Sequence, residues 1–138
     1  MIYLDTSALV KLIREAPESP ALGVYIDSHD GVRWFTSELA RTEVPRAVRR
    51  LNAEGDSRSL RSELGYADKL WESIDLVPIT SKVLSEAGAI EHPFLRSLDA
   101  IHLATAAGVK ASVTAFVTYD KRLATVAKGA GLPVTAPA

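Results

Sequence analysis

The sequence predicts an α/β fold in which a central, mostly parallel β-sheet is flanked by helices on both faces. Short apolar runs alternate along the chain with longer segments of helical periodicity, and this alternation is typical of parallel strands joined by crossover helices. The 138 residues are enough for one domain with its own core. No linker, internal repeat or low-complexity segment divides them. We therefore expect a single domain spanning residues 1–138.

The N-terminal half is expected to contain two strands and four helices. The strands are the apolar runs 1–4 and 32–36, which end at Asp5 and before Ser37. Pro45 lies inside the third helix and should kink it, because proline removes one backbone donor. The expected helices are the segment from Asp5 to Ile13, residues 21–29 opened by Ser19 and Pro20, a helix capped by Ser37 that reaches Leu51, and the amphipathic segment 60–71.

The C-terminal half is expected to contain three strands and three helices. Residues 74–79 form a weak strand, and Pro78 within it indicates an edge strand or the end of a strand. Residues 113–119 form the clearest strand of the chain. The remaining elements are a helix from Thr80 to Ile90, a helix over 98–107 capped by Ser97 and ended by Gly108, a helix over 121–128 and a short strand over 132–135.

Composition excludes several classes of protein. The chain has no cysteine, which excludes disulfides and thiolate metal sites and favours a reducing cytoplasm. No apolar run approaches the ~20 residues that span a bilayer, so we expect no membrane contact. The apolar N-terminus lacks a basic leader and is interrupted by Asp5, unlike a signal peptide. The net charge of -1 argues against a broadly basic nucleic-acid surface but leaves local basic patches open.

Four carboxylates fall at positions where the fold would bring them together. Asp5 ends the first strand and Asp120 ends the strand over 113–119. If those strands are parallel, both acids lie at the carboxyl edge of the sheet, where α/β folds bind ligands. Glu43 lies on the helix after the second strand, and Asp99 lies in the first turn of a later helix. We expect the four to converge on one cleft.

Each of these acids also has a purely structural explanation. Asp5 and Asp120 are favoured helix N-caps, and Asp99 suits the positive end of a helix dipole. Glu43 could pair with Arg46 or Arg50 along its own helix. These explanations do not account for the two most apolar strands both ending in aspartate. The joint pattern therefore favours a functional site.

A cluster of carboxylates makes chemical sense with a bound cation, because neighbouring carboxylates repel one another. Mg²⁺ and Mn²⁺ suit such hard oxygen ligands, and a pair of these ions can clamp the attacking and leaving oxygens of a phosphoryl displacement. The hydroxyl groups of Thr6, Ser7 and Thr118 are expected to orient the carboxylates or a water molecule. The three histidines, at positions 29, 92 and 102, have no zinc-ligand spacing.

Several segments of the chain resemble the PIN-domain ribonucleases, most closely the VapC toxins of VapBC toxin–antitoxin systems. The resemblance covers essentially the whole chain, with one departure, Pro45, two residues after Glu43. It rests on residues 5–9 (Asp-Thr-Ser-Ala-Leu), Glu43, residues 97–106 (Ser-Leu-Asp-Ala-Ile-His-Leu-Ala-Thr-Ala) and residues 117–120 (Val-Thr-Tyr-Asp).

The resemblance implies that Asp5, Glu43, Asp99 and Asp120 form a catalytic quartet that binds Mg²⁺ or Mn²⁺. It further implies an RNA substrate, a homodimer and a cognate VapB-type antitoxin that blocks the site. Three basic side chains near the predicted cleft either contact RNA phosphates or form a solvated surface; these are Arg46, Arg50 and Lys11.

Two side-chain types receive a structural interpretation. His102 lies one helical turn after Asp99, and a packed or partly exposed histidine is expected there, with the cleft as the alternative. Trp34 and Trp71 are expected in the core or an interface rather than as base-stacking surfaces.

Two other functions fit parts of the sequence. The first is a catalytically inactive PIN-type module that only binds, which the presence of all four acids disfavours. The second is an aspartyl-phosphate enzyme with Asp5 as nucleophile, which lacks its usual second acid because Ser7 occupies that position.

Overall fold

Five short parallel strands form the central sheet. They are β1 (Ile2–Leu4), β2 (Trp34–Ser37), β3 (Asp75–Val77), β4 (Ala115–Val117) and β5 (Val134–Thr135). Their order across the sheet is β3-β2-β1-β4-β5, and every neighbouring pair is parallel. The computed structural model describes all residues from 1 to 138. β1 therefore lies at the centre of the sheet, and the residue that follows it, Asp5, leaves from the middle of its carboxyl edge.

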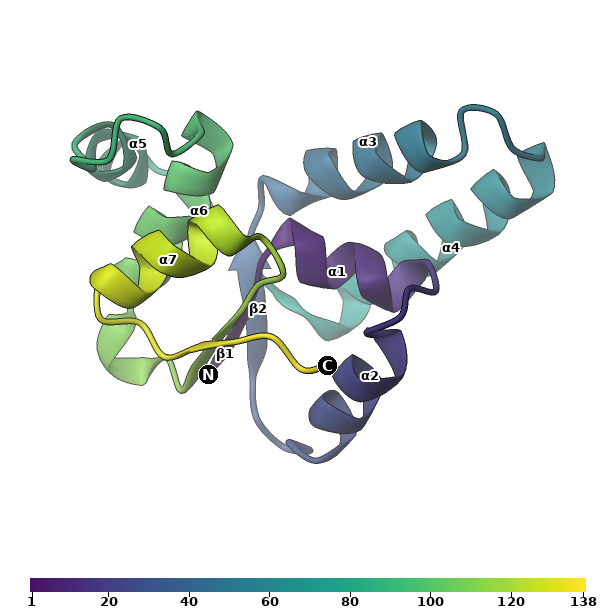
Figure 1. The fold of residues 1–138 in the computed structure, drawn as a ribbon, viewed down its shortest axis with the longest axis horizontal. Coiled ribbons are helices and arrows are strands. Elements are labelled where there is room, and N and C mark those ends of the chain that lie inside the picture. The colour runs from purple at the N-terminus through teal and green to yellow at the C-terminus, as the bar shows by residue number, and fades with distance from the viewer.

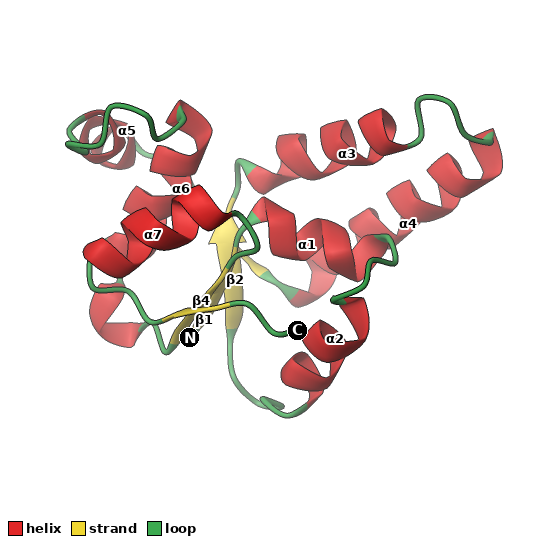
Figure 2. Cartoon of the chain, in the orientation of Figure 1, coloured by secondary structure: helices red, strands yellow, loops and turns green.

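Seven helices cover the sheet, with helices on both faces as the sequence predicts. Figure 1 shows α1 to α4 on one side of the strands and α5 to α7 on the other, and Figure 2 shows the strands between these two groups. No helix is both long and apolar enough to cross a membrane. The helices are α1 (Thr6–Ile13), α2 (Ser19–Asp27), α3 (Ala40–Leu51), α4 (Ser57–Ser73), α5 (Ser81–Gly88), α6 (Ser97–Ala107) and α7 (Lys121–Gly129), and a 3₁₀ turn spans Lys110–Ser112.

Alternation along the strands divides the core into two layers. Ile2 and Leu4 pack with α1 to α4 on one face, while Tyr3 between them packs with α6 and α7 on the other. This period of two is the geometry of an extended strand, and both faces are apolar because helices bury both. Trp34 and Trp71 pack partly buried against the first layer, as expected.

The strand that precedes Asp120 is shorter than the sequence predicts. It ends at Val117 rather than Tyr119, so Asp120 lies three residues beyond the strand and caps α7. The reason is a pair of side-chain hydrogen bonds: the backbone N–H of Tyr119 donates to the Ser7 hydroxyl, and that of Asp120 donates to Thr118 Oγ1. Side-chain hydroxyls thereby replace the sheet partners of these two groups, and the chain turns into the site.

Three predicted serine caps are also wrong. Ser37 is the last residue of β2, and α3 begins only at Ala40, although the Ser37 hydroxyl accepts from the Leu39 N–H. Ser97 is already inside α6. Ser19 is already inside α2, and its hydroxyl instead accepts from the Ala16 N–H and donates to the Lys11 carbonyl. The predicted edge position of the strand containing Asp75–Val77 is confirmed, since β3 ends the sheet.

Candidate active site

A cleft of about 580 Å³ opens at the carboxyl edge of the sheet, beside β1 and β4. Three of the four predicted acids line it, namely Asp5, Asp99 and Asp120. The fourth, Glu43, is a half-buried neighbour of the same group and contributes to the raised pKa of Asp99. Residues separated by more than a hundred positions are therefore brought together. The other polar residues of the lining are Thr6, Ser7, Lys11, Arg14, Glu15, Arg50, His102 and Tyr119.

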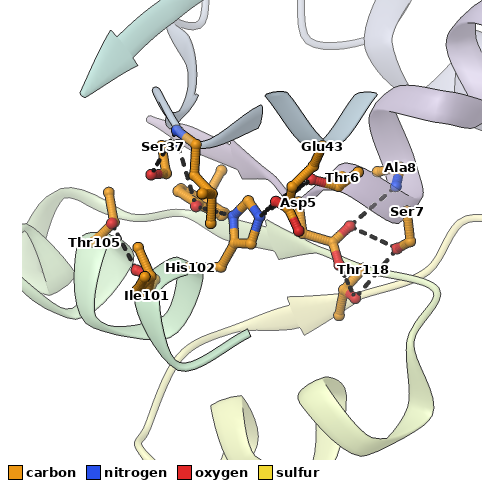
Figure 3. Close-up of polar contacts among 12 residues, drawn as sticks. Asp5, Thr6, Ser7, Ala8, Ser37, Glu43, Ile101, His102, Thr105 and Thr118 are labelled. Atoms are coloured by element: carbon orange, nitrogen blue, oxygen red, sulfur yellow. Dashed lines mark hydrogen bonds and ion pairs between the residues drawn. The ribbon is translucent and has the colours of Figure 1, made fainter. Parts of the chain in front are cut away.

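Asp5 is almost fully buried and is held by three hydrogen bonds (Figure 3). Its Oδ1 accepts from the Ser7 hydroxyl at 2.6 Å and from the Ala8 N–H at 3.0 Å, and its Oδ2 accepts from the Thr118 hydroxyl at 2.6 Å. Burial raises the pKa of Asp5 above its usual value, although the Ser7 and Thr118 bonds oppose the rise. Asp5 thus caps α1 and lies in the cleft at the same time, so the structural and functional explanations are compatible.

Glu43 is oriented by groups from two other helices. Its Oε1 accepts from the Thr6 hydroxyl at 2.7 Å and lies 2.5 Å from His102 Nε2. Burial acts to raise the pKa of Glu43, but the hydrogen bonds from His102 and Thr6 together hold it below its usual value. No ion pair joins Glu43 to Arg46 or Arg50, so the predicted pairing along its own helix does not form.

Asp99 and Asp120 have far fewer hydrogen bonds. Asp120 accepts only from the Leu123 N–H, at 2.9 Å, as the N-cap of α7. Asp99 accepts no hydrogen bond from the protein, and it lies in the first turn of α6. Burial and the neighbouring Asp120 carboxylate raise the pKa of Asp99. These two carboxylates therefore retain oxygen lone pairs for a ligand.

His102 both packs in the core and lines the cleft. It is 1% exposed, and its ring lies between Glu43 and the Tyr3 hydroxyl, which is 2.5 Å from Nδ1. Its position three residues after Asp99 was a signal for the cleft, whereas nothing in the sequence pattern singled out Tyr3. The available signal for Tyr3 was its type, because a buried tyrosine usually needs a polar partner for its hydroxyl.

The three predicted RNA-binding cations differ in placement. Arg50 is exposed and lines the cleft. Lys11 lines it too, but its ammonium lies 2.8 Å from Glu18 and 4.9 Å from the centre of the Tyr119 ring. Arg46 is exposed and is absent from the cleft lining. The lining also contains Arg14, which pairs with Glu63 at 3.4 Å.

The donor set of the cleft fits a hard divalent cation. No lysine or arginine forms an ion pair with any of the four carboxylates, and the one basic side chain in contact with them is His102, beside Glu43. As the side chains lie, no three acids or histidines are close enough to surround one ion. Mg²⁺ does not require that, because it is usually held by one or two carboxylates and keeps several water ligands.

Comparison with known proteins agrees with this geometry. The PIN domain family matches residues 2–129 of the chain. Ribonuclease VapC35 of Mycobacterium tuberculosis is 46% identical over 99% of this chain and 97% of that protein, and Ribonuclease VapC47 of the same organism is 40% identical over the same shares. The crystal structure of VapBC2 from Rickettsia felis bound to a promoter DNA fragment covers 100% of both chains, with a TM-score of 0.74 at 14% identity. The chain therefore belongs to the PIN-domain family and, within it, to the VapC proteins.

Proposed function

We propose that this protein is a Mg²⁺- or Mn²⁺-dependent endoribonuclease that acts as the toxin of a VapBC toxin–antitoxin system. The observation that carries the proposal is that three carboxylates line one cleft and Glu43 lies beside them, with no lysine or arginine paired to any of the four. The extended identity to proteins named as VapC ribonucleases supports the reaction class. Asp5, Glu43, Asp99 and Asp120 are the residues that would hold the ion.

The residues around the quartet fix the positions of two of its carboxylates by hydrogen bonds. A bound divalent ion would polarise the phosphodiester and activate water for hydrolysis. Ser7 and Thr118 fix both oxygens of Asp5, while Thr6 fixes one oxygen of Glu43. Asp99 and Asp120 present carboxylate oxygens without side-chain partners. The site therefore combines two anchored acids with two that a ligand can recruit.

The RNA substrate would enter past Arg50 and Lys11, which together form the basic rim of the cleft. Arg50 and Lys11 belong to the lining, so their side chains can reach phosphates that approach the acids. Phosphate contacts of this kind position a nucleic acid without reading its sequence. A net charge of -1 makes these local cations the main source of attraction for RNA.

A cognate VapB-type antitoxin is the proposed partner that silences the site. An arginine of its tail would form charge-assisted hydrogen bonds with the unpaired carboxylates in place of metal. The structural relative from Rickettsia felis is itself a VapBC2 complex. We further propose a homodimer in the cytoplasm, since two-fold dimers are the commonest oligomers. Sedimentation of a species heavier than the 14.9 kDa chain would support the dimer.

The reaction is tested by RNA cleavage before and after metal removal. The purified protein, stripped with EDTA and dialysed, should leave total cellular RNA intact, and addition of Mg²⁺ or Mn²⁺ should restore cleavage. Asp99→Asn protein purified in parallel reports any contaminating nuclease. Cleavage that persists unchanged in EDTA, or cleavage of equal strength by the Asp99→Asn preparation, would contradict the proposal.

A further inference from the structure

A buried chain of polar contacts runs from β1 through α6 to Glu43. The Tyr3 hydroxyl lies 2.5 Å from His102 Nδ1, and His102 Nε2 lies 2.5 Å from Glu43 Oε1. The Thr6 hydroxyl also lies 3.2 Å from Nε2. Figure 3 shows the His102 ring beside Glu43, Thr6 and Asp5, at the point where α1 and α6 meet the carboxyl edge of the sheet. This series of contacts therefore ends at Glu43, a member of the acidic quartet.

The Tyr3 side chain, at the first contact of this series, is held in place by packing. It is fully buried, and its ring stacks on Phe116 at 4.9 Å with an interplanar angle of 4°, while Phe35 meets it edge-on at 5.0 Å. Its hydroxyl oxygen accepts the Ser37 N–H at 3.2 Å. The hydroxyl proton is then available for a second partner. Packing and hydrogen bonding together leave the Tyr3 hydroxyl with one position.

The contacts also indicate where the imidazole carries its proton. Glu43 Oε1 is a carboxylate oxygen that can only accept, so Nε2 must be the donor in that contact. Nδ1 can then accept the Tyr3 hydroxyl proton. The Tyr3 hydroxyl is able to donate, because a tyrosine with an ordinary pKa of about 10 is protonated at neutral pH. A histidine whose second nitrogen is fixed by a hydrogen bond presents the other nitrogen in a defined direction.

The two oxygens of Glu43 differ as a result. Oε1 receives both the Thr6 hydroxyl and His102 Nε2–H. Oε2 has no hydrogen-bond partner in the protein and is not fully buried, because Thr36 Oγ1 is the single fully buried side-chain polar atom that lacks a partner. A glutamate side chain loses rotamer freedom when it is fixed, so two donors on one oxygen leave the other oxygen aimed in one direction.

We propose that Tyr3 and His102 are positioning residues, which hold Glu43 by Oε1 and so present Oε2 to a divalent cation. The inference rests on the proposed function, since it concerns the same acidic site. His102 acts through Glu43 and does not itself ligate the ion. This role gives a reason for the burial of a polar tyrosine–histidine pair, since Tyr3 is fully buried and His102 is 1% exposed.

Two substitutions of His102 separate positioning from packing. In His102→Gln the longer amide can reach the place of Nε2 and still donate to Glu43, whereas in His102→Asn the shorter amide reaches only the place of Nδ1. Mn²⁺ affinity, measured by electron paramagnetic resonance on the protein without RNA, should fall about 10–100-fold in His102→Asn, the usual cost of losing a partner that orients a ligand. His102→Gln should retain most of the affinity, and Tyr3→Phe should lie between them.

Thr105→Val is the matched control. Thr105 lies on α6 one turn after His102, is 3% exposed, and uses its hydroxyl only to donate to the Ile101 carbonyl. Its replacement should lower the melting temperature without changing Mn²⁺ affinity. Wild-type affinity in His102→Asn, or equal losses in His102→Asn and His102→Gln, would overturn the positioning role.

A second readout does not depend on metal or on activity. Proton–nitrogen correlation spectra of the ¹⁵N-labelled wild type should show a proton on His102 Nε2, assigned by its absence in His102→Gln among only three histidines. Tyr3→Phe should shift the Nδ1 resonance of His102. An unprotonated Nε2 would overturn the inference whatever the metal does. If Asp5→Asn binds Mn²⁺ as well as the wild type, the proposed metal site fails, and the Nε2 proton still decides the positioning of Glu43.

Discussion

The two walls of the cleft hold their carboxylates in different ways. On the wall built by α1 and α3, Asp5 accepts three hydrogen bonds and Glu43 accepts two. On the wall built by α6 and α7, Asp120 accepts a single backbone N–H and Asp99 accepts none. The fold therefore fixes the first pair by itself. The second pair is left with unsatisfied charge, which a cation or an antitoxin arginine would neutralise.

The electrostatics follow the same division, with one exception. Hydrogen bonds hold the pKa of Glu43 below its usual value, while burial and Asp120 raise that of Asp99. Asp5 is the exception, because its near-complete burial outweighs three hydrogen bonds and raises its pKa. Hydrogen bonds from the protein thus fix the position of a carboxylate, but they do not by themselves stabilise its charged form.

The largest expected effect comes from neutralising the most tightly anchored acid. In Asp5→Asn the side chain can still cap α1, because asparagine caps as well as aspartate, and a desolvated charge is removed. The melting temperature should be unchanged or raised, while RNA cleavage should fall by at least about 100-fold, the scale of removing one electrostatic group from an active site. Cleavage and melting are measured on the same preparation. Retained cleavage would show that Asp5 is only a cap.

A smaller effect should separate Glu43 from Asp99 by its sign. The charge of Glu43 is favoured by folding, and that stability is present above its usual pKa of 4.5 and lost as the pH falls through the lower folded value. Glu43→Gln should therefore melt a few degrees lower than the wild type at neutral pH, since charge-assisted hydrogen bonds are roughly twice as strong as neutral ones. The difference in melting temperature between Glu43→Gln and the wild type should decrease as the pH is lowered.

Asp99→Asn should show the opposite trend. Folding disfavours the charge of Asp99, so the penalty appears as the pH rises through a folded pKa that lies above the usual 3.8. The variant should melt higher than the wild type at neutral pH, and the two should converge in acid. Melting curves across the acidic to neutral range, without metal, compare both variants. The same sign for both would mean that Glu43 and Asp99 do not differ as described.

The smallest effect concerns the basic rim. The test uses an Asp5→Asn background, in which cleavage is expected to be lost. On it, Arg50→Ala should weaken binding of a single-stranded RNA oligonucleotide. The slope of log affinity against log salt concentration should become shallower by about 0.7, the value for one phosphate contact. Arg46→Ala is the matched control, because Arg46 lies on the same helix but outside the cleft lining. Fluorescence anisotropy at several salt concentrations measures both. An equal loss from Arg46→Ala would point to a diffuse basic surface.

Sequence reasoning could predict where the candidate site lies because its first signals are local. A strand ending in aspartate identifies Asp5 from adjacent residues alone, and the alternation of strands and helices places both aspartates near one edge. The partners of Glu43 were not local. Helical spacing suggested Arg46 or Arg50, but Thr6 and His102, which come from other helices, contact Glu43 instead.

Two further features required the folded chain. The contact between Tyr3 and His102 joins residues 99 positions apart, and no spacing rule connects a strand to a helix at that distance. The early end of β4 depends on hydroxyls of Ser7 and Thr118 taking backbone N–H groups from the sheet. The strand propensity of these residues cannot reveal that the Ser7 hydroxyl, which comes from α1, competes for a backbone N–H group.

The most direct test of the account is Mn²⁺ binding to the wild type and to the four single amide variants, Asp5→Asn, Glu43→Gln, Asp99→Asn and Asp120→Asn. Each is titrated by electron paramagnetic resonance under one set of conditions, and Thr105→Val serves as the control. If anchored and open acids form one cation site, all four variants bind Mn²⁺ more weakly than the wild type and the control does not. Wild-type affinity in all four variants would contradict the claim that these carboxylates hold the ion.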